Sequence, residues 1–382
     1  MIAIVGGNVY TGRGKLIPRG TVLVEGERIV AVGQGITIPR DAQVKDVSGM
    51  TVFPGMIDAH CHVGLFEEGL GWEGDDVNEI TDPITPQLRA VDGINPEDVG
   101  LKEAARAGVT AVWSAPGSAN IIGGQGVALH TVGRFVEDMV LREPCGLKAA
   151  LGENPKRCYG LELKKSPSTR MGSAATLRET LVKAQNYARK KKHAEEKGEP
   201  VEIDFKLEPI VKLLKGELTL RLHAHRADDI MTGIRIAREF GFPICIDHCT
   251  EGHKVADVLA RERIPAVIGP SLTGRVKVEL RELDFATVAA CASAGVKVAI
   301  ATDHPVVPSK YLPLCVGLAI KAGLSWDYAL QAVTLNAAEI IGIDDQVGTI
   351  EAGKLADICV AQGDPFSIEG KMVAVMVKGQ WL

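Results

Sequence analysis

The feature that most constrains the fold is an alternation of apolar runs with amphipathic helical patterns across residues 54–345. The runs expected to be strands are, in chain order, TVFPGMIDAH, VTAVWSA, GVALHT, LKAALGE, LTLRLHAH, FPICIDH, PAVIGP and VKVAIATD. The patterns between them include PEDVGLKEAARAG and ADDIMTGIRIAREFG, and several end in Gly, as helix C-caps do. This alternation predicts an α/β fold with a parallel barrel, whose chemistry lies at the C-terminal strand ends. The third run is the least regular, because GSANIIGGQG before it is expected to be a flexible active-site loop.

The two ends of the chain have a different residue pattern from the middle. Residues 1–53 and 346–382 consist of short stretches rich in valine and isoleucine, separated by Gly turns. Alternating apolar and polar residues are typical of half-buried antiparallel strands. We therefore predict one small β-domain built from residues 1–53 plus 346–382, beside a barrel formed by residues 54–345.

Composition excludes several classes of protein. The net charge of −5 and the 4% aromatic content provide neither a basic stripe nor a base-stacking surface, so we expect no nucleic-acid partner. No run of about 18 apolar residues occurs, and the start lacks a signal-peptide pattern, which predicts a cytoplasmic protein without a membrane partner. The eight cysteines contain no CxxC pair, which argues against a disulfide framework or a cysteine-only zinc site.

Histidines and carboxylates recur where the predicted strands end. His60 and His62 are one residue apart, so in a strand their imidazoles share a face and can converge on one metal ion. The further strand-end residues are Glu153, His223, His225, His248, Asp303 and His304. Imidazoles and carboxylates from separate strands, with one position left for water, are what zinc or a similar divalent metal requires.

These motifs resemble the amidohydrolase superfamily, in particular the branch around imidazolonepropionase. The resemblance rests on PGMIDAHCH, the histidine-bearing fifth and sixth strands, TDHP, and the tail VTLNAAEIIGI followed by VGTIEAGKLADI. It implies a metal-dependent hydrolase with a (β/α)8 TIM-like barrel and a composite β-sandwich domain formed by both termini.

The resemblance also implies roles for individual residues. His60 and His62 match first-strand metal ligands, His223 a fifth-strand ligand and His248 a sixth-strand ligand. Asp303 matches a residue that is both a ligand and the general base. Since the first histidine of such a strand end usually binds, His225 is expected to face the substrate instead. The cofactor expected is a divalent metal, Zn²⁺ above all, as one or two ions.

The residue that would bridge two metals is left open. Many two-metal members use a carboxylated lysine from the fourth strand, and others use a glutamate. Glu153 suits the second pattern and is predicted as a metal ligand, whereas Lys148 lies too early in its strand to reach the mouth. Lys206 is the rival lysine, but FKLEPIVKLLKGE has helical spacing and places it before or on a helix.

Substrate contacts are predicted from loops beside the ligands. Lys156, Arg157, Arg170 and Arg226 are cations near the expected mouth, which favours a small, anionic substrate. Ion pairs with Asp228, Asp229 or Glu251 are the alternative role for these cations. His304, beside Asp303, is a further predicted contact.

Three functions are compatible with this pattern. The leading one is hydrolysis of a C–N bond in a small cyclic amide or amidine, or in a peptide-like amide, by metal-activated water with Asp303 as base. The second is a metal-dependent deaminase of a small heterocycle. The third is a catalytically silent scaffold of the same fold. A homo-oligomer is common among relatives, but no residue pattern indicates an interface.

Overall fold

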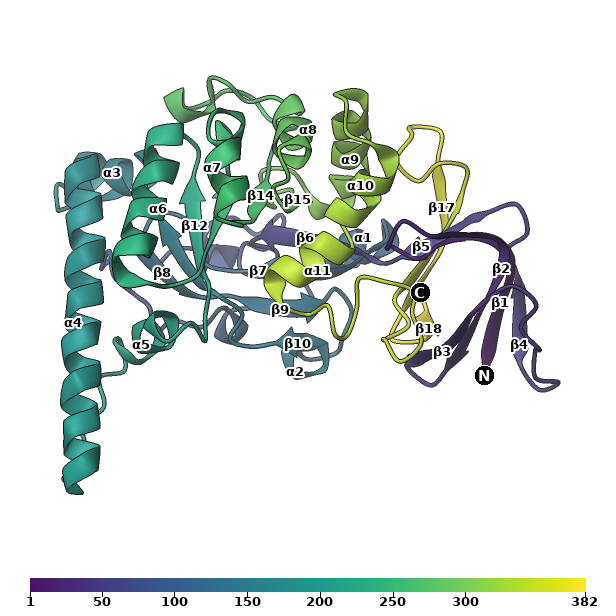
Figure 1. The fold of residues 1–382 in the computed structure, drawn as a ribbon, viewed down its shortest axis with the longest axis horizontal. Coiled ribbons are helices and arrows are strands. Elements are labelled where there is room, and N and C mark those ends of the chain that lie inside the picture. The colour runs from purple at the N-terminus through teal and green to yellow at the C-terminus, as the bar shows by residue number, and fades with distance from the viewer.

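The computed structural model describes residues 1–382, and strands from both ends of the chain form one mixed sheet in it (Figure 1). Its eight strands are β1 Ile2–Tyr10, β2 Leu16–Glu25, β3 Arg28–Gly33, β4 Gln43–Asp46, β5 Thr51–Pro54, β16 Ile358–Gln362, β17 Lys371–Val377 and β18 Gln380–Trp381. The two ends join where β5 pairs antiparallel with β16 and parallel with β1. Branched side chains such as Val22, Val52 and Val360 fill a core of their own. The terminal strands therefore form a mixed sheet that is separate from the α/β body.

Ten strands form the α/β body. They are β6 Met56–Cys61, β7 Val109–Ser114, β8 Ile122–Gln125, β9 Val127–His130, β10 Val140–Arg142, β11 Leu147–Ala150, β12 Leu220–Ala224, β13 Ile244–His248, β14 Ala266–Ile268 and β15 Val298–Ile300. Strands β11 to β15 pair in parallel in chain order, and β6 pairs in parallel with β7. The backbone N–H of Asp303, just after β15, donates to the carbonyl of His60 at 3.0 Å, which joins the last strand to the first.

The third strand position departs from the predicted parallel barrel. Strands β8 and β9, interrupted only at Gly126, run antiparallel to β11 and to β7 respectively. A parallel connection needs a crossover of about a dozen residues or more, whereas only residues 115–121 separate β7 from β8. The prediction of eight parallel strands is therefore wrong here, and residues 122–125 of GSANIIGGQG are strand instead of loop.

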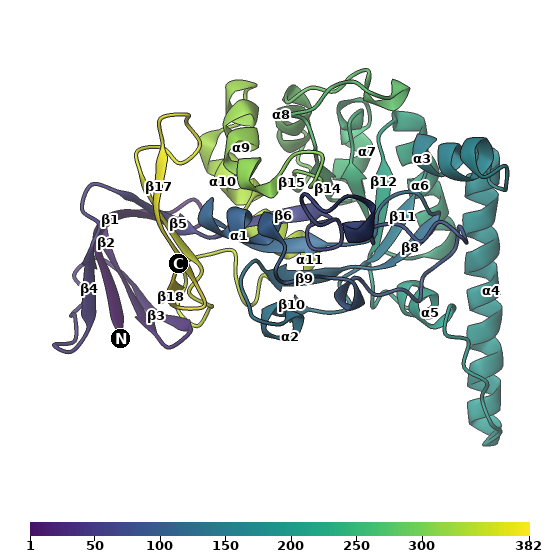
Figure 2. The same ribbon diagram turned by 180° about the vertical axis from the view of Figure 1, so that it is seen from behind.

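Helices flank the body strands (Figures 1 and 2). They are α1 Val99–Arg106, α2 Val136–Met139, α3 Glu153–Lys156, α4 Arg170–Lys197, α5 Glu208–Leu214, α6 Ala227–Phe240, α7 Ala256–Arg261, α8 Ala286–Ser293, α9 Leu312–Lys321, α10 Trp326–Ala332 and α11 Leu335–Ile341. Shorter helical turns are η1 Gly71–Gly74, η2 Ala90–Asp92, η3 Arg157–Glu162, η4 Gly252–Lys254, η5 Val278–Leu280 and η6 Ser309–Tyr311. Local signals set their ends: the Asp98 carboxylate caps α1, and left-handed Gly241 ends α6.

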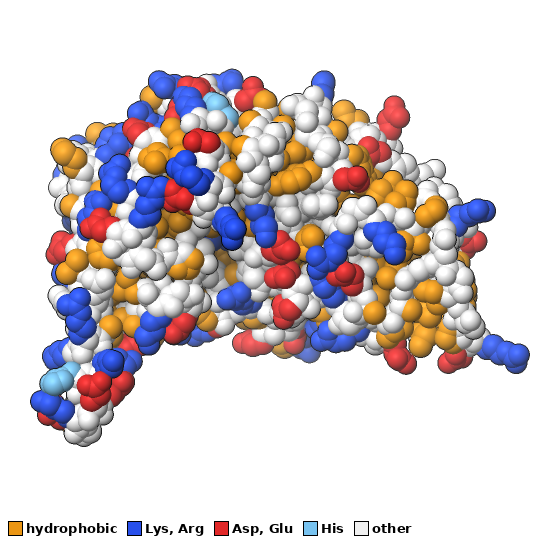
Figure 3. All heavy atoms as spheres, in the orientation of Figure 1, with side chains coloured by type: hydrophobic (Ala, Val, Ile, Leu, Met, Phe, Trp, Pro, Cys, Tyr) orange, Lys and Arg blue, Asp and Glu red, His pale blue; other side chains and the backbone are white.

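Helix α4 projects well beyond the rest of the body (Figures 1 and 2). Its first half packs through Ala174, Leu177 and Leu181, which are buried. The projecting end carries side chains of both charges (Figure 3). No helix in the structure is both long enough and apolar enough to span a membrane.

Apolar side chains form two layers, one on the outer face of the body strands and one on the inner face. Large side chains fill the layer between strands and helices, whereas the interior is lined mainly by small ones, including Ala59, Ala111, Cys245 and Ala299. Small interior residues leave room for long polar side chains within the ring of strands. That space positions the site described next.

Candidate metal centre

Six residues nominated from the sequence gather into two clusters at one end of the body strands. One cluster is His60, His62 and Asp303, and the other is His223, His225 and His248. Within each cluster the candidate ligand atoms all lie within 4.8 Å of one another. The rings of His60 and His248 are 4.7 Å apart between centroids, so the two clusters adjoin. The predicted convergence of strand-end residues is therefore present.

A bulge in β6 aims its histidines inward. Asp58 pairs with Val112 and Cys61 with Ser114, so two residues of β6 face a single residue of β7 between these pairs. Ala59 lies in the interior layer, and Cys61 lies in the outer one. An extra residue of this kind re-aims the side chains that follow it. Simple alternation would instead place Asp58 on the same face as the histidines.

Hydrogen bonds orient the first cluster. Nδ1–H of His62 donates to the carbonyl of Ala115 at 2.7 Å, so Nε2 faces the Asp303 carboxylate at 3.2 Å. Nε2 of His60 lies 3.4 Å from the same oxygen. Burial acts to raise the pKa of Asp303, but the neighbouring imidazoles of His248, His60 and His62 outweigh it and hold that pKa well below its usual value. The carboxylate is therefore ionised at neutral pH.

The second cluster depends on an unusual backbone conformation. His248 has φ of 72°, and its Nδ1–H donates to the carbonyl of Gly269 at 2.8 Å. This turn brings its ring to the interior side that Asp247 also occupies. Burial lowers the pKa of His223 and of His248 well below the usual value, and lowers that of His225 to about 4. All three rings are neutral at pH 7, which is the form that ligates metals.

Lys148 also reaches this site, contrary to prediction. The side chain is fully buried, and its Nζ lies 3.0 Å from Nε2 of His60. Burial lowers the pKa of Lys148 to about 8, although the charges of Asp247 and Asp303 oppose that shift. A strand rises about 3.3 Å per residue, so the four-carbon stem of lysine carries its nitrogen about two residues further along. The expectation that Lys148 lies too early is wrong for that reason.

Glu153 is not part of either cluster. It begins α3 directly after Gly152, and its backbone N–H donates to Oε2 of Glu279 at 3.0 Å. Glu279, on the loop after β14, is a carboxylate that approaches the second cluster: its Oε1 lies 3.7 Å from Nε2 of His225. Sequence reasoning missed Glu279 because VKVEL has no strand-end or metal-ligand pattern.

An ion pair beneath the clusters supports His60. Two guanidinium nitrogens of Arg221 donate to Oδ1 of Asp247, at 2.7 and 3.1 Å, and Oδ2 of Asp247 lies 3.1 Å from Nδ1 of His60. The Arg221 guanidinium also lies 3.8 Å from the ring centre of Trp113. Asp247 therefore favours a proton on Nδ1 of His60, so the lone pair is on Nε2, which faces Lys148 and Asp303.

The predicted substrate-binding arginines are all paired with neighbouring carboxylates. The pairs are Arg157 with Glu162 at 3.2 Å, Arg170 with Asp229 at 2.9 Å and Arg226 with Asp228 at 2.8 Å. Lys156 ends α3. The cation beside the imidazoles is Lys277, whose Nζ lies 3.0 Å from both Oδ1 of Asn154 and Oε1 of Glu279. Nothing in the local sequence had marked it.

His304 is not a member of either cluster. It is completely buried, and its ring packs so closely on Gly100 of α1 that a Cβ there would lie 2.8 Å from it. Its Nδ1 accepts the backbone N–H of Ser309 at 3.3 Å. This packing role does not support the predicted substrate contact. His130 is likewise internal, 3.1 Å from a carboxylate oxygen of Asp357.

The donor set suits a divalent metal. Neutral imidazoles with one carboxylate are typical zinc ligands. Nε2 of His225 is buried without a hydrogen-bond partner, an arrangement that a cation would relieve. A metal could therefore be held by His60, His62 and Asp303, with a second at the other imidazoles.

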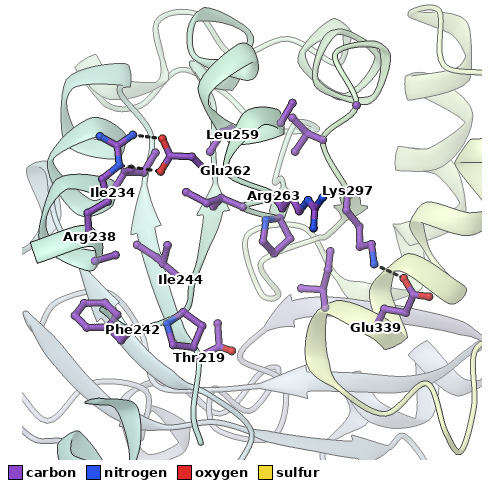
Figure 4. Close-up of a pocket in the computed structure, with 18 of the residues that line it drawn as sticks. Thr219, Ile234, Arg238, Phe242, Ile244, Leu259, Glu262, Arg263, Lys297 and Glu339 are labelled. Atoms are coloured by element: carbon purple, nitrogen blue, oxygen red, sulfur yellow. Dashed lines mark hydrogen bonds and ion pairs between the residues drawn. The ribbon is translucent and has the colours of Figure 1, made fainter. Parts of the chain in front are cut away.

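A further hollow lies away from the two clusters. A cavity of about 690 Å³ opens where strands β12 to β15 begin, at the end of the body opposite the clusters (Figure 4). Four of its charged side chains pair with one another, Arg238 with Glu262 and Lys297 with Glu339. Because chemistry in such folds lies at the other end of the strands, size alone does not mark this cavity as the active site.

Comparison with known proteins gives consistent relatives. Residues 222–382 match the model of the Amidohydrolase family. The crystal structure of an amidohydrolase from Thermotoga maritima MSB8 is 42% identical, covers 100% of this chain and 99% of its own, and superposes with a TM-score of 0.97. Amidohydrolase tasK of Hapsidospora irregularis is 30% identical over 94% of this chain. The match covers only 39% of the length of tasK. Imidazolonepropionase of Rhizobium meliloti (strain 1021) is 27% identical over 90% of this chain and 85% of its own length.

Proposed function

Because the chain belongs to the amidohydrolase family, we propose that it hydrolyses a C–N bond in a small cyclic amide or amidine with the help of a divalent metal. The observation that carries this proposal is the meeting of the two clusters around buried Lys148, with ionised Asp303 between His60 and His62. Zinc is the metal that we propose for these nitrogen and oxygen donors.

A divalent ion held by these residues would lower the pKa of a water molecule and polarise the scissile carbonyl or amidine carbon. Asp303 accepts the proton of the attacking water at its carboxylate, and it then returns that proton to the leaving nitrogen. Asp247 keeps the proton of His60 on Nδ1, and the carbonyls of Ala115 and Gly269 do the same for His62 and His248. These contacts leave each Nε2 lone pair directed at the site.

Lys148 is proposed to take the bridging role in place of Glu153. A buried lysine with a pKa of about 8 is partly neutral at pH 7.5, and a neutral amine adds CO₂ to form a carbamate with release of a proton. The carbamate would supply two oxygens close to His60 and within electrostatic reach of the other cluster.

The substrate class is proposed from the relatives and from one cation. Imidazolonepropionase, by its name, acts on an imidazolone, which is a cyclic amide, and it is similar to this chain over most of both lengths. Lys277 would bind an anionic group on the substrate. The arginines predicted for that role are instead paired with neighbouring carboxylates.

The test is an assay of the purified protein, after metal analysis, against cyclic amides, cyclic amidines and acyclic amides. Release of a new carboxylate or amine without free ammonia supports ring hydrolysis, whereas stoichiometric ammonia from a heterocycle would support the deaminase instead. A protein that binds no divalent metal and turns over no compound would be the silent scaffold, and the proposal would fail.

A further inference from the structure

Glu279 brings a second carboxylate to the imidazoles, from a loop that the sequence did not mark. It lies in η5, between β14 and α8, and its side chain is 1% exposed. Oε1 is 3.7 Å from Nε2 of His225 and 3.9 Å from Nε2 of His223. Both distances are too long for hydrogen bonds, yet they suit donor atoms that share one ion.

The facing nitrogens lack the partners that buried acceptors need. His225 is 3% exposed, and its Nε2 has no hydrogen-bond partner, whereas its Nδ1 lies 2.8 Å from the Thr250 hydroxyl. Nε2 of His223 has only the Asn154 amide, at 3.5 Å. Lone pairs and a carboxylate oxygen grouped in a buried site repel one another unless a cation lies between them.

We propose that Glu279 and His225 are donors to the second divalent cation, together with His223. The inference rests on the proposed function, because it assumes a divalent metal at the imidazoles. It assigns this cation a carboxylate from the β14–α8 loop, in addition to the ligands that the strand ends supply. His225 then acts as a metal ligand and not as the substrate contact predicted from the sequence.

Lys277 is the competitor for the same oxygen. Its Nζ donates to Oε1 of Glu279 at 3.0 Å and to Oδ1 of Asn154 at 3.0 Å. A cation that takes Oε1 must displace this ammonium, which still has Asn154 as an acceptor. Removal of the Lys277 charge therefore strengthens metal binding, whereas removal of the Glu279 charge weakens it.

The experiment is titration of metal-free full-length protein with Zn²⁺ against a competing chelator, and with Co²⁺ followed by its visible absorption. Wild type is expected to bind two ions. Glu279→Gln is expected to weaken one of them by about 10- to 100-fold and to change the Co²⁺ spectrum, while Lys277→Met tightens the same ion. Glu282→Gln is the matched control, because Glu282 lies on the same loop but pairs with Lys254 at the surface.

The opposite results overturn the inference. Glu279→Gln protein with two ions at wild-type affinity and an unchanged Co²⁺ spectrum excludes Glu279 as a donor. If that variant does not fold, as judged by circular dichroism, Lys277→Met decides: unchanged or weaker affinity contradicts the proposal. A wild type that binds one ion and still hydrolyses amides refutes this inference alone, whereas two ions without hydrolysis of any amide refutes only the proposed function.

Discussion

The side-chain nitrogen of Lys148 lies 3.0 Å from Nε2 of His60, and both side chains are buried. One comes from the middle of β11 and the other from the end of β6, so the contact crosses the interior of the ring of strands. Strand β11 also pairs with β12, which carries His223, and the charge of Lys148 contributes to the lowered pKa of that histidine. Lys148 is the residue through which the two clusters would act as one site.

Replacement of Lys148 is expected to remove the proposed bridge between the two clusters. In Lys148→Met the bound metal should fall from two ions per chain to one or none, with affinity reduced by about 10- to 100-fold or more, because the proposed bridge is lost. Metal analysis after dialysis measures this. Lys212→Met, on the exposed face of α5, is the control. Wild-type protein should also show a mass increment of one CO₂ under native conditions, and two ions in Lys148→Met would rule out the bridge.

Asp303→Asn is expected to keep metal and lose turnover. The amide retains one oxygen beside His60 and His62 but cannot accept the proton of the attacking water, so the rate should fall by about 100- to 10,000-fold. Steady-state kinetics with the best amide from the panel, beside metal analysis, provide the readout. Asp345→Asn, at an exposed position, should behave as wild type. Near wild-type rates in Asp303→Asn would contradict the assignment of Asp303 as the general base.

Asp247→Asn is expected to destabilise the fold strongly. It leaves the Arg221 guanidinium buried without its counter-charge, a change that typically costs about 3–5 kcal/mol in the free energy of unfolding. Urea denaturation of metal-free protein measures the loss. Glu239→Gln breaks the exposed Arg178 pair at 2.8 Å and should cost less than about 1 kcal/mol. Equal losses in the free energy of unfolding for the two substitutions would contradict the argument that a broken ion pair costs more when it is buried.

Asp58 predicts a pH dependence of stability in the metal-free protein. Burial raises the pKa of Asp58 to about 6, against the opposing effect of bonds from Thr302 and Ser309. The unfolded value is about 3.9, so the folded protein binds the extra proton between about pH 4 and 6. This contribution to stability is complete below about pH 4 and is lost as pH rises through about 6.

The free energy of unfolding of wild type minus that of Asp58→Asn should accordingly be larger, by about 1 kcal/mol, at pH 5 than at pH 7.5. Urea denaturation at the two pH values provides the measurement. A difference that is constant, or larger at pH 7.5, would show that Asp58 does not titrate in this range.

Hydrophobic patterning predicted most strands of the body, because a buried parallel strand reads as a short continuous apolar run. This pattern does not indicate whether a strand runs parallel or antiparallel to its neighbours. GVALHT forms β9 as expected, but β9 runs antiparallel to β7 because the connection from β7 is too short for a crossover. The terminal strands were also predicted, although pairing of β5 with β16 into one sheet was not.

The site was predictable only where regular strand geometry extends to the ligands. Alternation predicted His60 with His62, but the bulge before them and the left-handed backbone of His248 are backbone irregularities that no residue pattern encodes. The position of Lys148 early in its strand predicts that it falls short of the site, but its four-carbon stem carries Nζ to His60. Glu279 and Lys277 come from an irregular loop, and only the tertiary fold brings that loop over the imidazoles.

The antiparallel course of β8 has a consequence for motion at the mouth of the site. Residues 115–121 are held between two strands, and Gly117 and Ala119 are tied by their backbone N–H groups to Val77 and Asn78 at 2.7 and 3.0 Å. No helix follows this loop that could tilt with it, so this side of the mouth is a fixed wall. Val77 and Asn78 lie on the loop after β6, so that part of the loop belongs to the same wall, and we expect this side of the mouth to stay in place during substrate entry and product release.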